Sequence, residues 1–233
     1  MNERIVIQGL TKTYKKNEAL KDVDLTIPAG AIVGLLGPNG SGKTTLLKIL
    51  TGLIRSYKGT VSIGGRPVGE ETKKMIYNLP DEPYFADWMR VKDALGIFQD
   101  MYEDFDKARC LDMIGRFRIA EKARVRTLSK GTKEKFQLAL VLSRRAPIVI
   151  LDEPIGGVDP AAREVILDTI LENYTKDQTL LIATHLIAEL ERIFDVAIFI
   201  REGRILLNKD VESLRMETGR SVDELFRERF RYE

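Results

Sequence analysis

The sequence has very little cysteine and histidine and no long apolar run. Cys110 is its only cysteine, so it cannot form an internal disulfide, and nothing near it has the spacing of metal ligands. We expect an inert thiol on a helix face, in a reducing compartment. No stretch approaches the roughly 18 apolar residues of a membrane-spanning helix, and the N-terminus lacks the apolar run of a secretory signal. These absences predict a soluble, cytosolic chain with no direct membrane insertion.

An excess of one charge is also missing. The chain carries 37 Lys and Arg against 35 Asp and Glu, a formal net charge of +2. Such a balance gives no bulk attraction to nucleic acid or to an anionic membrane, so we expect any membrane role to come through a partner. With 44% hydrophobic residues, the chain can bury the core of one large α/β domain, with or without an inserted subdomain.

Short β-branched or alternating runs near the N-terminus predict an antiparallel layer of strands. A continuous apolar run at 32–36 leads into Gly37 and a helical stretch at 43–50, the order expected of a buried parallel strand and its following helix. Between about 87 and 145 the apolar spacing becomes helical, which indicates a helical insertion. The antiparallel strands are expected at 4–10, 19–27 and 60–63, and further parallel strands at 148–151, 180–183 and 196–200.

Helix and turn signals organise the C-terminal part. Asp159, followed by a proline, predicts the N-cap of an amphipathic helix that runs to Tyr174. The Glu-Gly pair at 202–203 predicts a hairpin turn. Ser221 and Glu224 form the pattern of a capping box before a final helix. We expect this helix to fold back on its own domain, with a role in steadying a dimer as the alternative.

Residues 37–44 match the phosphate-loop pattern G-x-x-x-x-G-K-[ST], after an apolar strand and at the start of a helix. Glycines allow the backbone N–H groups to curl around phosphate oxygens, and the helix N-terminus adds its positive end. Lys43 would neutralise the β- and γ-phosphates, and Thr44 would offer a hydroxyl to Mg²⁺. The alternative, a glycine-rich turn, does not explain the flanking strand and helix. The residues expected to bind phosphate are Gly37, Pro38, Asn39, Gly40, Ser41, Gly42, Lys43, Thr44 and Thr45.

Two acids end the apolar strand at 148–151. Asp152 is placed to hold the Mg²⁺ shell, and Glu153 to polarise the attacking water, because phosphoryl transfer needs positioning and a proton acceptor. Strands often end in acids simply because they end in water, but the phosphate loop favours the catalytic role. His185 follows another predicted parallel strand. A lone histidine is often structural, yet its place at the ligand-binding edge of the sheet favours contact with the γ-phosphate.

These elements, in this order, resemble the nucleotide-binding domain of ATP-binding-cassette (ABC) proteins from about residue 5 to 207. Leu128-Ser129-Lys130-Gly131-Thr132 resembles the family's Leu-Ser-Gly-Gly-Gln signature. The segment 156–159, which ends in Asp159, resembles the D-loop, and Thr184-His185 resembles the switch histidine. Tyr14 resembles the aromatic residue on which adenine stacks, although a tyrosine in a β-rich segment also serves packing.

The resemblance implies an α/β fold of the P-loop NTPase class. Its parts would be a RecA-like parallel-sheet core, an N-terminal antiparallel β layer and an inserted α-helical subdomain. We expect an ABC ATPase domain at 1–220, followed by a C-terminal helix at 221–233. Within the domain, 1–86 and 146–220 would form the catalytic core, and 87–145 the helical subdomain that carries the signature. ATP and Mg²⁺ are the implied cofactors.

The resemblance also implies partners. Two ABC ATPase subunits, identical or different, would face each other head to tail. Ser129 and Gly131 of one, at the start of a helix expected at about 132–143, would then complete the ATP site of the other. ATP would join this dimer, and hydrolysis would loosen it. A separate transmembrane permease would use the cycle for transport, as in bacterial exporter ATPases. The chain would then lie in the cytoplasm, peripheral on the inner face of the membrane.

Two positions depart from the family pattern. Asp81 stands where a glutamine usually links Mg²⁺ to the transmembrane partner. Its carboxylate can still reach the metal or its waters, but its charge near the triphosphate should retune the site, so Asp81→Gln is expected to change the Mg²⁺ dependence. Lys130 replaces the first glycine of the signature and adds charge at the dimer seam, or else points to solvent.

The sequence also allows other functions for the helical insertion and for the whole chain. The basic run of the helical insertion is either a solvated face or a docking surface for a permease or a nucleic acid. We do not expect nucleic acid, because cassettes of that kind usually carry a long coiled-coil or zinc-hook insertion, or two cassettes in one chain. A soluble cassette ATPase for iron–sulfur assembly, without a permease, is the remaining alternative. The basic run comprises Arg116, Arg118, Lys122, Arg124, Arg126, Lys130, Lys133 and Lys135.

Overall fold

The computed structural model describes residues 3–79, 85–86, 88–156 and 158–230. A four-stranded antiparallel sheet, in the order β2-β1-β4-β5, contains the three expected N-terminal strands. Two of them are longer than expected, because Tyr14 pairs with Asn17 across a tight turn and extends the hairpin to its tip. The strands of this sheet are β1 (Glu3–Tyr14), β2 (Asn17–Pro28), β4 (Lys58–Ile63) and β5 (Arg66–Pro67).

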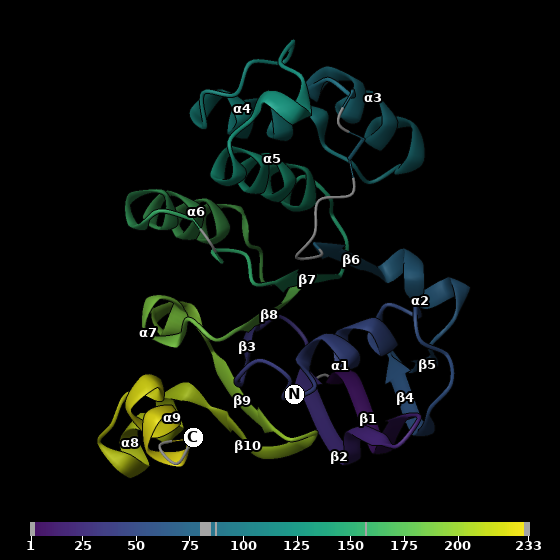
Figure 1. The fold of residues 1–233 in the computed structure, drawn as a ribbon, viewed down its shortest axis with the longest axis vertical. Helices are drawn as coiled ribbons and strands as arrows, with labels where there is room; N and C mark the ends of the chain where they lie inside the picture. Colours follow the sequence, from purple (N-terminus) through teal and green to yellow (C-terminus); the bar gives the residue numbers. More distant parts are fainter. Residues whose placement is uncertain (1–2, 80–84, 87, 157, 231–233) are drawn as a thin grey trace.

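A six-stranded sheet, in the order β10-β9-β3-β8-β7-β6, forms the centre of the molecule (Figure 1). Its strands are parallel except for β10, which pairs antiparallel with β9 through the expected hairpin. The fold is therefore the α/β class with an antiparallel layer, as the sequence predicts. The strands are β3 (Ile32–Leu36), β6 (Ile76–Leu79), β7 (Ile148–Asp152), β8 (Thr179–Thr184), β9 (Val196–Arg201) and β10 (Arg204–Asp210).

The central sheet is buried on both faces, because successive side chains of each strand enter different cores. Val33 and Leu35 of β3 belong to a core shared with the antiparallel sheet and α1 (Lys43–Leu50). Ile32 and Leu36 belong to a second core, which the remaining helices cover. This explains why β3 reads as a continuous apolar run rather than an alternating one.

Three helices form the upper end of the molecule in Figure 1, between β6 and β7 in the chain. They are α3 (Val91–Met101), α4 (Lys107–Arg116) and α5 (Lys130–Leu142). The expected start of the last helix, at about Thr132, is two residues too late. The side chain of Ser129 accepts a hydrogen bond from the Thr132 N–H and so caps a helix that begins at Lys130.

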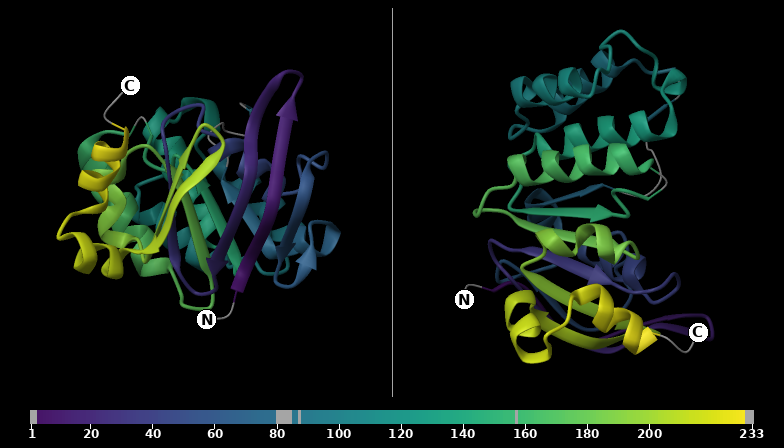
Figure 2. Two further views of the ribbon diagram at one scale, coloured as in Figure 1. Left: turned by 90° about the horizontal axis from the view of Figure 1, so that it is seen from below. Right: turned by 90° about the vertical axis from the view of Figure 1, so that its left-hand side faces the viewer.

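The remaining helices cover the face of the six-stranded sheet opposite the antiparallel layer, or connect strands (Figure 2). Asp159 caps α6 as expected, since its carboxylate accepts from the Ala162 N–H. In the C-terminal helix, Phe226 and Phe230 pack on Phe199 of β9, so this helix folds back on its own domain. No helix in the described part of the chain is both long and apolar enough to cross a membrane. The helices are α2 (Glu70–Met75), α6 (Pro160–Asn173), α7 (Ile187–Leu190), α8 (Val211–Thr218) and α9 (Val222–Phe230), with short 3-10 turns at Val125–Thr127 and Glu191–Ile193.

Candidate functional site

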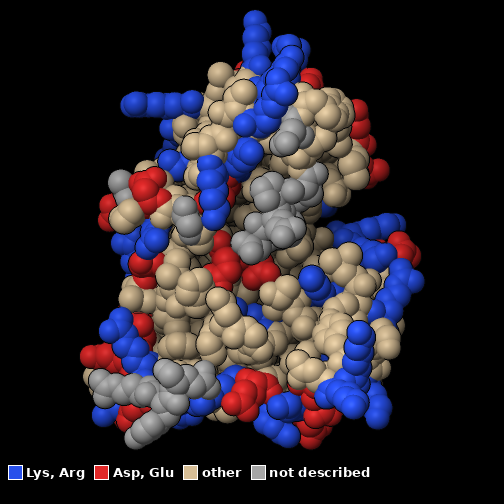
Figure 3. Space-filling model, viewed as in Figure 1, with Lys and Arg blue, Asp and Glu red and all other residues tan. Residues whose placement is uncertain are grey.

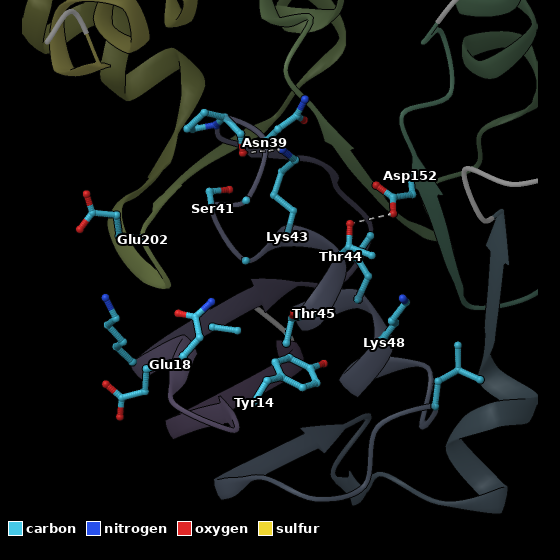
Figure 4. A pocket seen from close by; sticks show the side chains of 18 of the residues that line it. Tyr14, Glu18, Asn39, Ser41, Lys43, Thr44, Thr45, Lys48, Asp152 and Glu202 are labelled. Atoms are coloured by element: carbon cyan, nitrogen blue, oxygen red, sulfur yellow. Dashed lines mark hydrogen bonds between the residues drawn. The ribbon is translucent and has the colours of Figure 1, made fainter. Parts of the chain in front are cut away.

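A cavity of about 850 Å³ lies where the antiparallel sheet, the phosphate loop and the ends of β6 and β7 meet. The structure brings into it Tyr14, the loop from Pro38 to Thr45, Asp152 and Glu153. In Figure 4, Tyr14 lies in the lower part of the cavity, and Thr44 and Asp152 lie in the upper part. The cavity therefore has an aromatic end and a charged end, as a nucleotide site requires.

The phosphate loop connects β3 to α1 in the geometry that the sequence predicts. Gly42 has a φ of 111°, and a Cβ there would lie 2.7 Å from the carbonyl oxygen of Ala19, so only glycine fits. Gly40 also has a positive φ, but a Cβ there would meet nothing within 4 Å. Helix α1 begins immediately after the loop, so its positive end faces the cavity.

Lys43 is buried beside the loop, with 6% of its side chain exposed. Its ammonium group donates to the carbonyl oxygens of Gly37 (2.6 Å) and Pro38 (3.2 Å) and lies 4.0 Å from Glu153 Oε1. Burial lowers the pKa of Lys43, and the charges of Glu153 and Asp152 oppose that shift. A triphosphate would add anionic oxygens to these partners.

Ser41 supports the same conclusion. Its hydroxyl oxygen is buried and has no hydrogen-bond partner among the described residues. A buried polar group without a partner costs stability, so its presence in a phosphate loop is consistent with a ligand that satisfies it. The residues present therefore fit a bound triphosphate.

Thr44 and Asp152 bring two hard oxygen ligands together at the charged end. The Thr44 hydroxyl donates to Asp152 Oδ2 at 3.4 Å (Figure 4). Mg²⁺ usually takes few protein ligands and completes its octahedron with phosphate oxygens and water. In the described ranges, no group of three or more His, Cys, Asp or Glu side chains is arranged so that it could hold a metal ion by itself. The pair therefore fits Mg²⁺ only together with a bound phosphate.

Glu153 is held in a defined position at the end of β7. Its carboxylate accepts from the Thr184 hydroxyl (2.9 Å), and its other oxygen lies 2.9 Å from His185 Nδ1. Its backbone N–H donates to the Ala183 carbonyl, and its φ of 49° is unusual for a residue other than glycine. His185 does not line the cavity but contacts the acid that does. The structure thus groups Lys43, Glu153 and His185 at one sheet edge.

The hairpin turn between β9 and β10 joins the phosphate loop to the antiparallel sheet. The Gly203 N–H donates to the Ser41 carbonyl, and the Gly203 carbonyl accepts from the Lys21 N–H, both at 2.8 Å. Only glycine fits at this turn, because a Cβ would lie 2.6 Å from the Ala19 carbonyl oxygen. The two walls of the cavity are therefore connected through the main chain.

Tyr14 lies at the end of β1, and 44% of it is exposed. Its ring contacts the Lys12 ammonium group, 4.8 Å from the ring centroid. An aromatic ring that lines a cavity and stays this exposed is available for stacking with a flat ligand. These surroundings are not those of a tyrosine packed in the core, which was the alternative role.

The residues of the signature and the D-loop lie elsewhere. Ser129, Gly131 and Asp159 do not line the cavity. The Ser129 hydroxyl is paired with Thr132 Oγ1 at 2.8 Å, and the ammonium group of Lys130, whose side chain is 74% exposed, lies 3.9 Å from Glu134. Asp81, the expected third metal ligand, is outside the described residues.

Comparisons with known proteins decide the family. The model of the ABC transporter family matches residues 20–156. The ABC transporter ATP-binding protein YtrB of Bacillus subtilis is 32% identical over 216 residues, which cover 91% of this chain and 74% of the relative. This chain belongs to the ABC transporter family.

Other relatives agree with this assignment. The lantibiotic transport ATP-binding protein SrtF of Streptococcus pyogenes is 29% identical over 229 residues, which cover 97% of this chain and 97% of that protein. A solved structure of an ATP-binding subunit of an ABC transporter superposes with a TM-score of 0.85 at 27% identity, and the match covers 97% of this chain and 98% of that one. The chain is accordingly an ABC transporter ATP-binding subunit and an ATPase.

The ABC cassette also contains cavity residues that the sequence did not reveal. Glu18, Lys48, Thr51, Asn78 and Glu202 all line the cavity. Asn78 is the most informative of them, because its side-chain oxygen is buried without a partner among the described residues. The signal that could have found it is the rule that ligands gather at the carboxyl ends of parallel strands, since Asn78 lies near the end of β6.

Proposed function

We propose that this ABC subunit hydrolyses ATP to drive transport through a separate membrane-spanning permease, from a position on the inner face of the membrane. The family and the relatives named as transport ATP-binding proteins support this role. Co-purification after expression with the neighbouring membrane-protein gene tests it. Recovery of soluble partners alone would favour a cassette ATPase without a permease.

The catalytic site is proposed to be composite. The cavity contains the phosphate loop and the acids, but the Ser129 and Gly131 segment lies outside it, on another part of the surface. A second cassette, packed head to tail, would bring its own signature over the open side of this cavity. Ser129 and the first-turn amide of Gly131 would then donate to the γ-phosphate of the partner's nucleotide, and Asp159 would lie at the seam.

In this site the residues have separate tasks. Tyr14 stacks on adenine, while the loop amides and Lys43 hold the β- and γ-phosphates. Thr44 and Asp152, with Asp81 as the third proposed ligand, would hold Mg²⁺, which when bound would supply positive charge beside the phosphate oxygens. Glu153 orients the attacking water and receives its proton as the bond to the ADP leaving group breaks, while His185 positions the Glu153 carboxylate and contacts the γ-phosphate.

The observation that carries this proposal is the position of Glu153. It lies 4.0 Å from Lys43, 2.9 Å from His185 and 2.9 Å from Thr184, beside the Thr44–Asp152 pair. A carboxylate that is fixed from two sides, beside the phosphate loop, is placed to accept a proton rather than to bind a phosphate.

Glu153→Gln tests both hydrolysis and dimerisation. The amide keeps the shape but cannot accept the proton, so we expect Mg²⁺-dependent hydrolysis to fall on the order of 1,000-fold. The mass in solution should double with ATP and return to that of a monomer without it. A variant that stays monomeric with bound ATP would contradict the composite site.

Asp81→Gln tests the proposed metal role. Removal of a negative charge next to the triphosphate should shift the Mg²⁺ concentration for half-maximal hydrolysis, because the carboxylate no longer contributes to the cation's field. The measurement is a Mg²⁺ titration at saturating ATP. Identical titration curves for the two proteins would remove Asp81 from the metal site.

A further inference from the structure

One side chain joins the segment after Glu153 to the helix after His185. The guanidinium group of Arg163, which lies near the start of α6, donates from Nε to the Val158 carbonyl oxygen (2.9 Å) and from Nη1 to Glu189 Oε1 (2.5 Å). Val158 lies shortly after Glu153 in the chain, and Glu189 lies in α7, shortly after His185. Arg163 therefore connects the segments that follow the proposed proton acceptor and the histidine beside it.

The segment that contains Val158 is fixed at both of its ends. At the start, the Gly156 N–H donates to the Glu153 carbonyl oxygen at 2.9 Å. At the end, the Asp159 carboxylate caps α6. The bond from Arg163 to the Val158 carbonyl adds a third fixed point, because a carbonyl group outside helices and strands needs a donor from elsewhere. The path of the chain after Glu153 therefore depends on Arg163.

The Glu189 carboxylate also depends on Arg163. In the part of the chain that the structure describes, its second oxygen, Oε2, is buried and has no hydrogen-bond partner. Among those residues, loss of Arg163 would leave the whole carboxylate unpaired, which costs stability in a partly buried group. Helix α7 has only four residues, too few to be stable through its own hydrogen bonds. Contacts such as that of Glu189 therefore help to set the position of α7 and of His185, which precedes it.

The Val158 segment also touches the start of α5. Val158 is 3% exposed, and a Cβ built at Gly131 would lie 3.8 Å from its Cγ1, so the first turn of α5 lies against Val158. Contacts thus run from the signature through Val158 and Arg163 to α7. They continue to His185, whose Nδ1 lies 2.9 Å from Glu153. The signature is thereby joined to the acid that lines the cavity of its own chain.

The Arg163 pair differs from the exposed charges around it. Figure 3 shows basic and acidic side chains mixed on the side of the molecule where α6 and α7 lie. Arg192, in the turn after α7, pairs with Asp168 of α6, but the groups are 3.9 Å apart and the side chains are 53% and 63% exposed. The side chains of Arg163 and Glu189 are 23% and 38% exposed. Exposed pairs contribute little to stability, whereas Arg163 also holds a backbone carbonyl.

We propose that Arg163 is a positioning residue that couples the signature of one cassette to His185 and Glu153 of the same cassette. The inference rests on the proposed function, in which the partner's ATP engages this signature. Contact with that ATP would fix the start of α5 and, through Val158 and Arg163, would keep α7 and His185 in place against Glu153. Each cassette would then hydrolyse its own ATP best when its signature also contacts the ATP of its partner.

His185 provides a direct test, because it is the only histidine in the chain. Its ring signals can be followed by NMR in the ATP-free protein that contains isotope-labelled histidine. We expect Arg163→Gln to displace these signals, because α7 and His185 lose their support. Arg192→Gln is the matched control, since it breaks the exposed pair beside the same helices. It should leave the signals at their native positions.

Turnover tests the coupling itself. Arg163→Gln should lower the maximal rate of hydrolysis about tenfold, the size expected for coupling through packed contacts, and Arg192→Gln should not. The ATP affinity of the monomer and the ATP-dependent doubling of mass should stay unchanged in both variants. Arg163→Lys keeps the charge but not the two directed bonds, so its rate should fall nearly as far. The losses from Arg163→Gln and Glu189→Ala should not add in the double variant, because both remove one contact.

Three results would overturn the proposal. They are native His185 signals in Arg163→Gln, an equal loss of rate in Arg163→Gln and Arg192→Gln, and a loss of ATP affinity that accompanies the loss of rate. If the thermal unfolding midpoint shows that Arg163→Gln is not folded, Glu189→Ala takes its place in both measurements. If the native chain does not hydrolyse ATP, the proposed function fails, while the His185 signals still show whether Arg163 positions the histidine.

Discussion

The nucleotide cavity and the signature surface, which is the segment 128–132 at the start of α5, differ in how far their side chains already have partners. In the cavity, Lys43 is 6% exposed and Glu153 is 14% exposed, and both have fixed partners. On the signature surface, Lys130 is 74% exposed and has one weak ion pair. Under the proposed function, the comparison teaches that one chain would supply most of a nucleotide-binding site but only part of a catalytic site. Binding should therefore depend on the cavity alone, and turnover on both regions.

Among variants that test this comparison, Lys43→Ala is expected to have the largest effect on ATP binding. The change removes a buried cation from the phosphates, so ATP should bind about 100-fold more weakly, because truncation of a buried charged partner costs several kcal/mol. The measurement is binding of a fluorescent ATP analogue to the purified chain. Lys48→Ala is the matched control, since Lys48 lines the same cavity but is exposed, and it should cost less than about fivefold.

A similar loss in both variants would mean that the cavity attracts phosphate through its overall charge rather than through the phosphate loop. Folding of each variant is checked by its thermal unfolding midpoint, which exposes any general loss of structure.

Gly131→Asp should separate the two regions most clearly. A carboxylate in the first turn of α5 would face the partner's γ-phosphate, so hydrolysis should fall about 100-fold, since like charges brought together cost several kcal/mol. ATP binding by the monomer should stay unchanged. Gly131→Ala is the control, because a Cβ there meets only Val158 Cγ1, at an ordinary 3.8 Å. If Gly131→Asp also weakens ATP binding by the monomer, the separation of the regions is wrong.

Tyr14→Ala should have the smallest of these effects. Loss of a stacking platform removes about 1–3 kcal/mol per base, so ATP affinity should fall about tenfold, while the rate at saturating ATP stays the same. Tyr14→Phe keeps the ring and should bind normally. Equal affinities for all three proteins would show that the exposed ring does not contact adenine.

Much of the fold follows from the sequence, because the central strands are buried on both faces. The runs at 32–36 and 43–50 match β3 and α1 residue for residue, since an apolar run, a glycine loop and a helix leave little choice of boundary. The sequence does not reveal the shortest helices and strands. The four residues of β6 and the four of α7 are too few to show a period, and tertiary pairing with β7 determines the first of them.

The candidate site divides in the same way. The phosphate loop, Asp152 and Glu153 could be found because each combines a residue type with a local strand or helix signal. Asn78 and Glu202 lack such a local signal, because Asn78 lies in the four-residue strand β6 and Glu202 lies in the turn between β9 and β10. The helix at the signature begins at Lys130 rather than at about Thr132, because the Ser129 side chain caps it. The roles of the signature residues remain predictions.

The turn at Gly203 has a mechanical consequence. Its backbone bonds to the phosphate loop through Ser41 and to the antiparallel sheet through Lys21, so the walls that we propose to hold the base and the phosphates keep a set separation. The spacing between these two walls would therefore not adjust to the nucleotide. ADP and ATP would contact both walls alike. Only the third phosphate, which projects beyond the walls, could differ in its contact with a neighbouring cassette.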